Sequence, residues 1–227
     1  MAYKTMNDLM AEYRTHAAAK QWIEAHDTLT YGVQCAHLPA KLELARLYKD
    51  CALLGIPQQD RYRKAEYHYR GIVNLLDISD KVTAQICLEL AELYSYMKKR
   101  PVGILAMLLK AKRLGAQVPE REVNHARALL MELDVNRFGD HPLDAYELAL
   151  ELISANGSVR LTELLLREAC DCESDNKLIR GKVFLTLADF YNNRRHENYI
   201  YASEAARYYR QAAEAGFPEY LCRHNGA

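Results

Sequence analysis

The sequence predicts an all-α protein of stacked antiparallel helix hairpins, an α-solenoid with about eleven helices. Three observations predict this fold class. Apolar residues recur every three or four positions along most of the chain, which is the spacing of an amphipathic helix. Strand-like alternation of apolar and polar residues is almost absent. A five-residue pattern returns three times, and no low-complexity linker divides the 227 residues. One continuous helical-repeat domain over 1–227 is therefore expected.

The repeated pattern is Leu-Ala-x-x-Tyr, and it occurs at Leu44–Tyr48, Leu90–Tyr94 and Leu187–Tyr191. Each copy lies in a helical stripe and is followed, after a turn, by a second stretch that contains small residues. A small residue beside a large one lets two helices approach closely, and the tyrosine three positions later covers the joint. Because such a hairpin cannot bury its apolar face alone, several hairpins must stack.

Taken in chain order, residues 1–35 are expected to form a degenerate hairpin without a clean signature. Recognisable repeats follow at about 40–76 and 84–116. The segment 120–176 looks helical but carries no signature, so it is expected to contain further degenerate hairpins. The last recognisable repeat covers about 178–216.

Prolines and glycines support these boundaries. Pro101 and Pro142 suit the first turn of a helix, where a missing backbone N–H costs nothing. Gly115 and Gly216 follow apolar stretches, where a glycine that ends a helix belongs.

The charge balance argues against a protein devoted to phosphate backbones. Lys and Arg number 30 and Asp and Glu number 30, so the formal net charge is zero. Binding to nucleic acid needs a net basic face. The chain also lacks an apolar signal-peptide core and any run of about 18 apolar residues, so no membrane contact is expected. A cytoplasmic protein with reduced thiols is the expectation.

The repeats resemble the Sel-one-like repeat, a relative of the tetratricopeptide repeat. That family pairs a first helix carrying Leu-Gly/Ala-x-x-Tyr with a second helix reading roughly Lys-Ala-x-x-Trp-Tyr-x-Lys-Ala-Ala-x-x-Gly. The last repeat matches it at Ala205, Tyr208, Tyr209, Ala212, Ala213 and Gly216. The first repeat departs from it with His68 at the Trp position. The resemblance implies a right-handed superhelix and a non-catalytic, bacterial-type adaptor that binds another protein.

In the related tetratricopeptide proteins the first helices line a concave groove, which accepts an extended peptide or a partner helix. By analogy, the groove takes the positions just before and after the core residues of each first helix. These positions are Arg46, Lys49, Asp50, Glu92, Ser95, Tyr96, Asp189, Asn192 and Asn193.

No motif for catalysis, for a cofactor or for a phosphate group is present, so an enzyme is not expected. Cys170 and Cys172 with Cys222 and His224 could in principle hold zinc. A Cys-x-Cys at a helix end matches a structural zinc site poorly, so no metal is expected either.

Two alternative functions stay open. The first is a nucleic-acid-binding repeat protein, in which tyrosines stack on bases and basic side chains hold phosphates. Its residues would be Arg61, Arg63, Lys64, Arg207 and Arg210. The second alternative is a cytosolic chaperone for a secreted substrate.

Two segments bear on these alternatives. The stretch "EAARYYRQAAEAG" places Ala205, Tyr209 and Ala212 on one helical seam, which favours a buried helix over a base-stacking surface. The charged segment 192–201 is either a solvated turn or a recognition loop.

Overall fold

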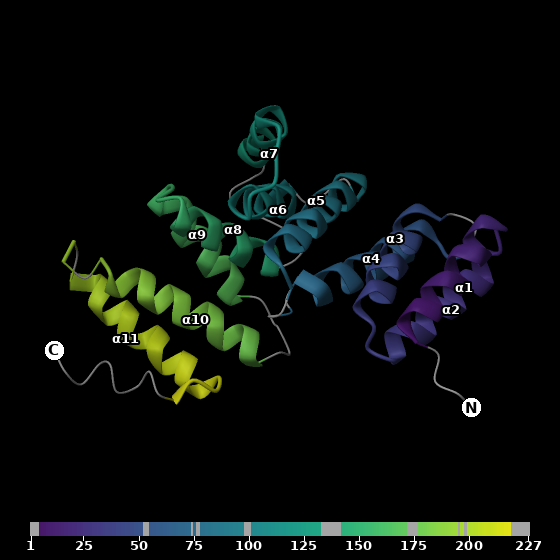
Figure 1. The fold of residues 1–227 in the computed structure, drawn as a ribbon. Coiled ribbons are helices and arrows are strands. Elements are labelled where there is room, and N and C mark those ends of the chain that lie inside the picture. The colour runs from purple at the N-terminus through teal and green to yellow at the C-terminus, as the bar shows by residue number, and fades with distance from the viewer. Residues whose placement is uncertain are drawn as a thin grey trace. The chain divides into compact units, whose positions relative to one another are not determined.

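The computed structural model describes residues 5–51, 55–73, 75, 78–97, 101–132, 142–171, 177–194, 196–197 and 199–218 (Figure 1). Within these residues the chain is helical and forms no strand, so the all-α prediction is confirmed. The course of a right-handed superhelix stays a prediction. The helices are α1 (Met6–Ala18), α2 (Trp22–Gln34), α3 (Leu38–Asp50), α4 (Gln58–Val73), α5 (Asp80–Tyr96), α6 (Pro101–Arg113), α7 (Glu120–Glu132), α8 (Pro142–Ser154), α9 (Val159–Asp171), α10 (Lys177–Asn192) and α11 (Tyr199–Glu214).

The chain divides into two compact units. The first covers Met1–Lys99 and Lys110–Pro119, and the second covers Arg100–Leu109 and Glu120–Ala227. The division passes through α6, so this one helix contributes residues to both units. The expectation of a single domain over 1–227 stays a prediction.

Several helices that follow one another in the chain pack against one another within each unit. In the first unit α1 contacts α2, α2 contacts α3, α3 contacts α4 and α4 contacts α5, while α1 also touches α3 (Figure 1). In the second unit α8 packs on α9, α9 on α10 and α10 on α11. Stacked hairpins produce this kind of contact between neighbours in sequence.

The Leu-Ala-x-x-Tyr pattern forms the core of both units. All three copies are buried at their leucine, alanine and tyrosine positions: Leu44, Ala45, Tyr48, Leu90, Ala91, Tyr94, Leu187, Ala188 and Tyr191. The first copy lies in α3, the second in α5 and the third in α10. The predicted core positions of the repeat are therefore confirmed.

The helix ends follow the expected signals. Pro101 and Pro142 are the first residues of α6 and α8. Gly115 has a φ of 89° and Gly216 a φ of 113°, two residues beyond the ends of α6 and α11. Residues other than glycine rarely adopt this left-handed backbone conformation, which is why glycine ends these helices.

The segment 120–176, which carries no sequence signature, contains α7, α8 and α9. Two of them, α8 and α9, pack on each other as a hairpin. The expectation of a degenerate hairpin in this segment is thus confirmed for α8 and α9.

The C-terminal stretch "EAARYYRQAAEAG" covers most of α11 and includes the side chains that this helix buries. Tyr209 and Tyr208 are 3% and 6% exposed, so both rings are buried. Tyr208 stacks on Tyr191, with ring centroids 6.0 Å apart, and on Phe184. The expectation of a buried seam is confirmed, and neither ring is available to stack on a base.

None of the described helices combines the length and the apolar character that a bilayer crossing requires.

Candidate functional site

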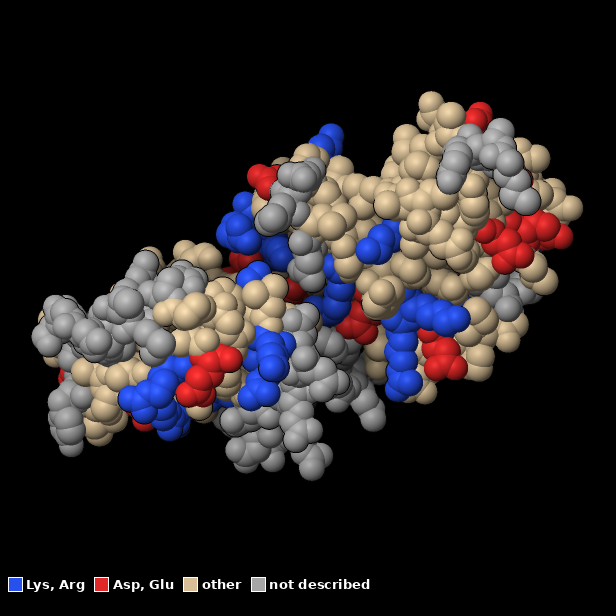
Figure 2. Space-filling view, turned by 90° about the horizontal axis from the view of Figure 1, so that it is seen from below, with Lys and Arg blue, Asp and Glu red and all other residues tan. Residues whose placement is uncertain are grey.

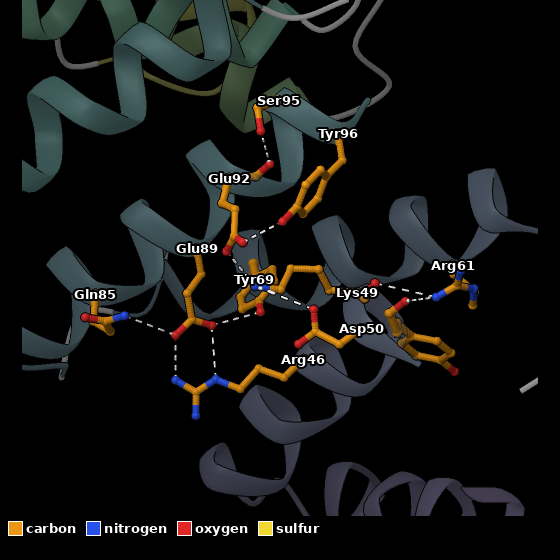
Figure 3. Close-up of polar contacts among 11 residues, drawn as sticks. Arg46, Lys49, Asp50, Arg61, Tyr69, Gln85, Glu89, Glu92, Ser95 and Tyr96 are labelled. Atoms are coloured by element: carbon orange, nitrogen blue, oxygen red, sulfur yellow. Dashed lines mark hydrogen bonds and ion pairs between the residues drawn. The ribbon is translucent and has the colours of Figure 1, made fainter. Parts of the chain in front are cut away.

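Six of the nine residues predicted to line the groove lie together in the first unit, on α3 and α5 (Figure 3). They belong to a set of hydrogen bonds and ion pairs that also includes Tyr69 of α4. We call this set the α3–α5 network, and it consists of Arg46, Lys49, Asp50, Tyr69, Gln85, Glu89, Glu92, Ser95 and Tyr96.

The Glu89 carboxylate of α5 is the centre of the α3–α5 network. Arg46 donates to both of its oxygens, from Nη2 at 2.6 Å and from Nε at 3.0 Å. The Tyr69 hydroxyl donates to Oε2 at 2.8 Å, and the Gln85 amide donates to Oε1 at 3.3 Å. The Glu89 side chain is only 11% exposed, so these donors replace the water that the carboxylate loses.

A second ion pair lies one turn further along both helices. Lys49 of α3 donates to Glu92 of α5 at 2.7 Å and lies 3.8 Å from Asp50. The Tyr96 hydroxyl donates to the other Glu92 oxygen at 2.8 Å, and the Ser95 hydroxyl donates to the Glu92 backbone carbonyl. The Lys49 side chain is 8% exposed, so most of its length is covered by the protein.

The two ion pairs show that α3 and α5 run in the same direction. Arg46 and Glu89 are 43 residues apart, and so are Lys49 and Glu92. A step of three residues along α3 therefore matches a step of three residues along α5. Parallel neighbours of this kind are what two consecutive hairpins present when their first helices lie side by side.

The electrostatics of the network follow from these contacts. Burial raises the pKa of Glu89, but the hydrogen bonds from Arg46 and Tyr69 outweigh burial and hold this pKa below its ordinary value. The hydrogen bond from Lys49 lowers the pKa of Glu92. Burial and the neighbouring Glu89 carboxylate raise the pKa of the Tyr69 hydroxyl. The network is thus built for ionised carboxylates and a neutral phenol.

Arg46 and Lys49 are committed to α5 and do not offer free charges to a partner. The groups at the same end of the unit that do face solvent are Asp50, with a side chain 66% exposed, and Glu92, 48% exposed. Tyr96 is also 48% exposed and stacks on Tyr62 of α4, with centroids 6.2 Å apart. The exposed part of the site is therefore acidic and aromatic.

The other three predicted residues lie in the second unit, at the C-terminal end of α10. The Asp189 carboxylate accepts a hydrogen bond from the Tyr209 hydroxyl of α11, so it joins the two helices of one hairpin. Asn192 is half-buried and Asn193 is exposed.

The segment 192–201 is shorter as a loop than expected, because α11 already begins at Tyr199. Arg194 lies over the Phe190 ring at 4.4 Å and 3.7 Å from Glu197. Arg195 and Asn198 lie outside the described residues.

Arg61, the first residue of the nucleic-acid alternative, is buried in the first unit. Its Nη1 donates to the backbone carbonyls of Tyr48 at 3.1 Å and Lys49 at 3.5 Å, at the C-terminal end of α3. A cation there satisfies carbonyls that the helix itself leaves unpaired. Arg61 is thus buried and has a structural role, while Arg63, Lys64, Arg207 and Arg210 are exposed.

Charges of both signs occur on the face drawn in Figure 2. There, basic side chains lie close to acidic ones, and broad uncharged areas separate these mixed groups. This view matches the zero net charge of the chain.

A contact that the sequence analysis missed joins each repeat tyrosine to the second helix before it. The Tyr48 hydroxyl meets Nε2 of His26 on α2 at 2.8 Å, and the Tyr94 hydroxyl donates to Glu66 on α4 at 3.3 Å. The Tyr191 hydroxyl donates to Glu163 on α9 at 2.7 Å. We call these three contacts the tyrosine joints.

Two of the tyrosine joints share one sequence spacing that could have revealed them. In both, the glutamate precedes the tyrosine by 28 residues and pairs with an arginine four positions later. The arginine also lies over the tyrosine ring, at 5.7 Å for Arg70 and 6.0 Å for Arg167. The spacing Glu-x₃-Arg-x₂₃-Tyr is therefore a second repeat signature.

No group of three or more potential metal ligands comes together among the residues that the structure describes. Cys170 is half-buried near the end of α9, whereas Cys172, Cys222 and His224 lie outside the described residues.

Comparison of the chain with protein-family models, with curated proteins and with solved structures finds no match.

Proposed function

We propose that this protein is a non-catalytic helical-repeat adaptor that binds a segment of a partner protein. It works in the cytoplasm as a bacterial-type relative of the Sel-one-like and tetratricopeptide repeat proteins. Its hairpins continue one another as a right-handed superhelix, and its first helices form the concave side that accepts an extended peptide or a helix.

The observation that carries this proposal is the parallel pairing of α3 with α5. The pairs Arg46–Glu89 and Lys49–Glu92 hold the first helices of two consecutive hairpins side by side in a fixed register. A repeat scaffold binds its partners on a surface of this kind, because neighbouring helices present their exposed side chains together.

The chemistry of the exposed groups narrows the partner to a segment with Lys or Arg side chains. We call Asp50, Tyr62, Glu92 and Tyr96 the α5 end. It places the exposed Asp50 carboxylate beside the ion pair of Glu92 with Lys49 and beside a stacked pair of tyrosine rings. A cationic side chain gains from Asp50 through a charge-assisted hydrogen bond and from the faces of the rings.

A peptide array tests this proposal directly. Purified protein is applied to an array of random twelve-residue peptides, and the bound peptides are compared between wild type and the double variant Asp50→Asn/Tyr96→Ala. Wild type should select peptides enriched in Lys and Arg, and the double variant should lose them. The matched control is Glu24→Gln/Tyr31→Ala, which removes one exposed carboxylate and one exposed tyrosine from α2 of the same unit.

Binding of the same peptides by the Asp50→Asn/Tyr96→Ala variant would contradict the assignment of the α5 end. An array on which wild type binds no peptide at all would contradict the adaptor proposal itself.

A further inference from the structure

A second polar surface of the first unit lies on α2, α3 and α4, and it is basic. We call Lys41, Lys64, His26 and His68 the lysine cluster. Lys64 and His68 lie four residues apart on one side of α4, while Tyr62 of the α5 end is about 200° away from Lys64 around the helix. The lysine cluster is therefore a different surface from the α5 end.

The tyrosine joint of α3 holds the cluster together. The His68 ring stacks in parallel on the Tyr48 ring, with centroids 5.8 Å apart. His26 bonds to the Tyr48 hydroxyl from the side of α2, and the Lys64 ammonium lies 5.4 Å from the centre of the Tyr48 ring.

The side chain of Lys41 lies against a glycine one turn beyond His68. A Cβ atom at Gly71 would come within 2.5 Å of the Lys41 Nζ. The side chain of Lys41 therefore crosses from α3 to the backbone of α4. This brings the two ammonium groups of Lys41 and Lys64 toward the same imidazole ring.

The two lysines lack counter-charges. Among the described residues neither Lys41 nor Lys64 forms an ion pair with a carboxylate, in contrast to Arg46 and Lys49 on the other side of α3. Burial and the nearby charges of Lys41, Lys64 and His26 lower the pKa of His68 to about 4, so its ring is neutral at neutral pH. The buried Nδ1 of His68 has no hydrogen-bond partner within the described part of the chain. The local field at His68 is therefore positive.

Apolar side chains border the cluster. Tyr67 is 73% exposed and its ring meets the His68 ring edge-on at 5.3 Å. Ile23 is 66% exposed and lies one turn before His26 on α2. Exposed apolar side chains beside unpaired charges are typical of surfaces that contact a partner protein.

We propose that the lysine cluster binds an acidic segment of a partner protein, with an Asp or Glu carboxylate placed between Lys41 and Lys64. Tyr67 and Ile23 cover the apolar residues beside that carboxylate. The bound carboxylate supplies the counter-charge that the fold leaves out.

An acidic peptide fits this surface better than a nucleic acid. A phosphate backbone needs an extended basic face, whereas here a carboxylate, Asp27, 75% exposed, stands 3.2 Å from His26 at the edge of the cluster. Arg61 of α4 is used by backbone carbonyls of α3.

Fluorescence anisotropy tests the proposal with three labelled probes: an eight-residue glutamate peptide, the same peptide with glutamine, and a single-stranded oligonucleotide. Wild type should bind the glutamate peptide more tightly than the other two probes. The variant Lys41→Gln/Lys64→Gln should bind it about tenfold more weakly, as expected for the loss of charge-assisted contacts. Lys182→Gln, which removes an exposed lysine of α10, is the matched control and should bind as wild type does. Thermal melts of each variant verify the fold.

His68 provides a second readout that a purely structural role of the lysines would not give. A carboxylate between Lys41 and Lys64 lies beside the His68 ring, so the NMR signals of this ring at pH 7 should shift when the glutamate peptide is added and stay unchanged with the glutamine peptide. The Asp50→Asn/Tyr96→Ala variant should keep this response, which separates a failure here from a failure of the α5 end. Equal affinity of wild type and Lys41→Gln/Lys64→Gln for the glutamate peptide would overturn the proposal. A higher affinity of wild type for the glutamine peptide or for the oligonucleotide than for the glutamate peptide would overturn it as well.

Discussion

The hydroxyl groups of the repeat tyrosines determine how one hairpin meets the hairpin before it. Tyr48, Tyr94 and Tyr191 place their rings in the core and their hydroxyls against a polar side chain of the preceding second helix. A buried hydroxyl without a partner costs free energy. The position of the polar side chain on the preceding helix is therefore fixed by the tyrosine that meets it, and the register between hairpins follows.

Tyrosine burial leads to a prediction for α11. Tyr209→Ala should lower the free energy of unfolding by about 3 kcal/mol, because it removes a buried ring and its hydrogen bond to Asp189. Urea unfolding followed by circular dichroism measures this. Tyr67→Ala is the control, since that ring is 73% exposed and should cost under about 0.5 kcal/mol. A loss under about 1 kcal/mol for Tyr209→Ala would mean that the ring is not part of the core.

His68 gives a prediction for the dependence of stability on pH. The pKa of His68 is about 4 in the folded protein and ordinarily 6.5. Above pH 6.5 the ring is neutral in both states. As the pH falls from 6.5 toward 4, His68 binds a proton in the unfolded chain but not in the folded protein. The free energy of unfolding therefore decreases.

His68→Phe should therefore reduce the loss of stability between pH 6.5 and 4.5, while keeping a ring that stacks on Tyr48. Urea midpoints measured across this range provide the test. Glu89 and Glu92 have pKa values below their ordinary 4.5, so their contribution is lost only at lower pH. A His68→Phe profile with the wild-type slope between pH 6.5 and 4.5 would contradict the assignment.

At the scale of the helix, the sequence pattern predicted the apolar face of α3 correctly but not the use of its polar face. The leucine, alanine and tyrosine of the repeat must be buried, so their periodicity identifies them. Arg46 and Lys49 are polar residues beside that face, and periodicity alone cannot distinguish a solvated charge from one that meets another helix. Their partners Glu89 and Glu92 are 43 residues away, and only the stacking of α3 on α5 brings them together.

The two ion pairs between α3 and α5 should contribute unequally to stability. Glu89 is 11% exposed and Glu92 is 48% exposed, so solvent screens the second pair more strongly. A double-mutant cycle with Arg46→Ala and Glu89→Ala should give a coupling energy of about 2 kcal/mol. The cycle with Lys49→Ala and Glu92→Ala should give under about 1 kcal/mol.

These coupling energies come from urea unfolding of the two single variants and the double variant in each cycle. Because Asp50 and Tyr96 also contact the second pair, each of its single variants must be shown to keep the far-ultraviolet spectrum of wild type. A coupling near zero for Arg46 with Glu89 would mean that the two helices do not depend on this pair.

At the scale of the whole molecule, the two units repeat one arrangement of three helices. The joint formed by Glu66, Arg70 and Tyr94 returns as Glu163, Arg167 and Tyr191. Five residues before each tyrosine, a side chain of the first helix meets the preceding first helix: Glu89 bonds to Arg46 on α3, and Thr186 bonds to Tyr146 on α8 at 3.2 Å. The hairpin of α8 and α9 thus corresponds to that of α3 and α4.

This correspondence explains why the segment before α10 carried no visible signature. The sequence pattern used to find repeats consists of apolar and small residues in the first helix, and α8 lacks the Leu-Ala-x-x-Tyr pattern. The polar contacts of the tyrosine joint are present all the same. They connect the second helix of this hairpin, α9, to Tyr191 of the next first helix, α10. The pairing of α3 with α4 and of α10 with α11 was therefore predictable from the pattern, whereas for α8 and α9 the sequence predicted a hairpin without showing which residues join it to the next.

The two units should unfold together. Helices α1 to α5 pack on one another in sequence order, as do α8 to α11, and α6 contributes residues to both units. Because a helix forms cooperatively, disorder that starts in one unit should spread through α6 to the other. Tyr69→Ala in the first unit and Tyr209→Ala in the second remove rings that are 0% and 3% exposed, and each should lower the midpoint of one common unfolding transition. Urea unfolding combined with hydrogen exchange of each unit measures this, with Tyr67→Ala as the control. If Tyr69→Ala reduced the protection of the first unit alone and left that of the second unit as in wild type, the chain would consist of two independent domains.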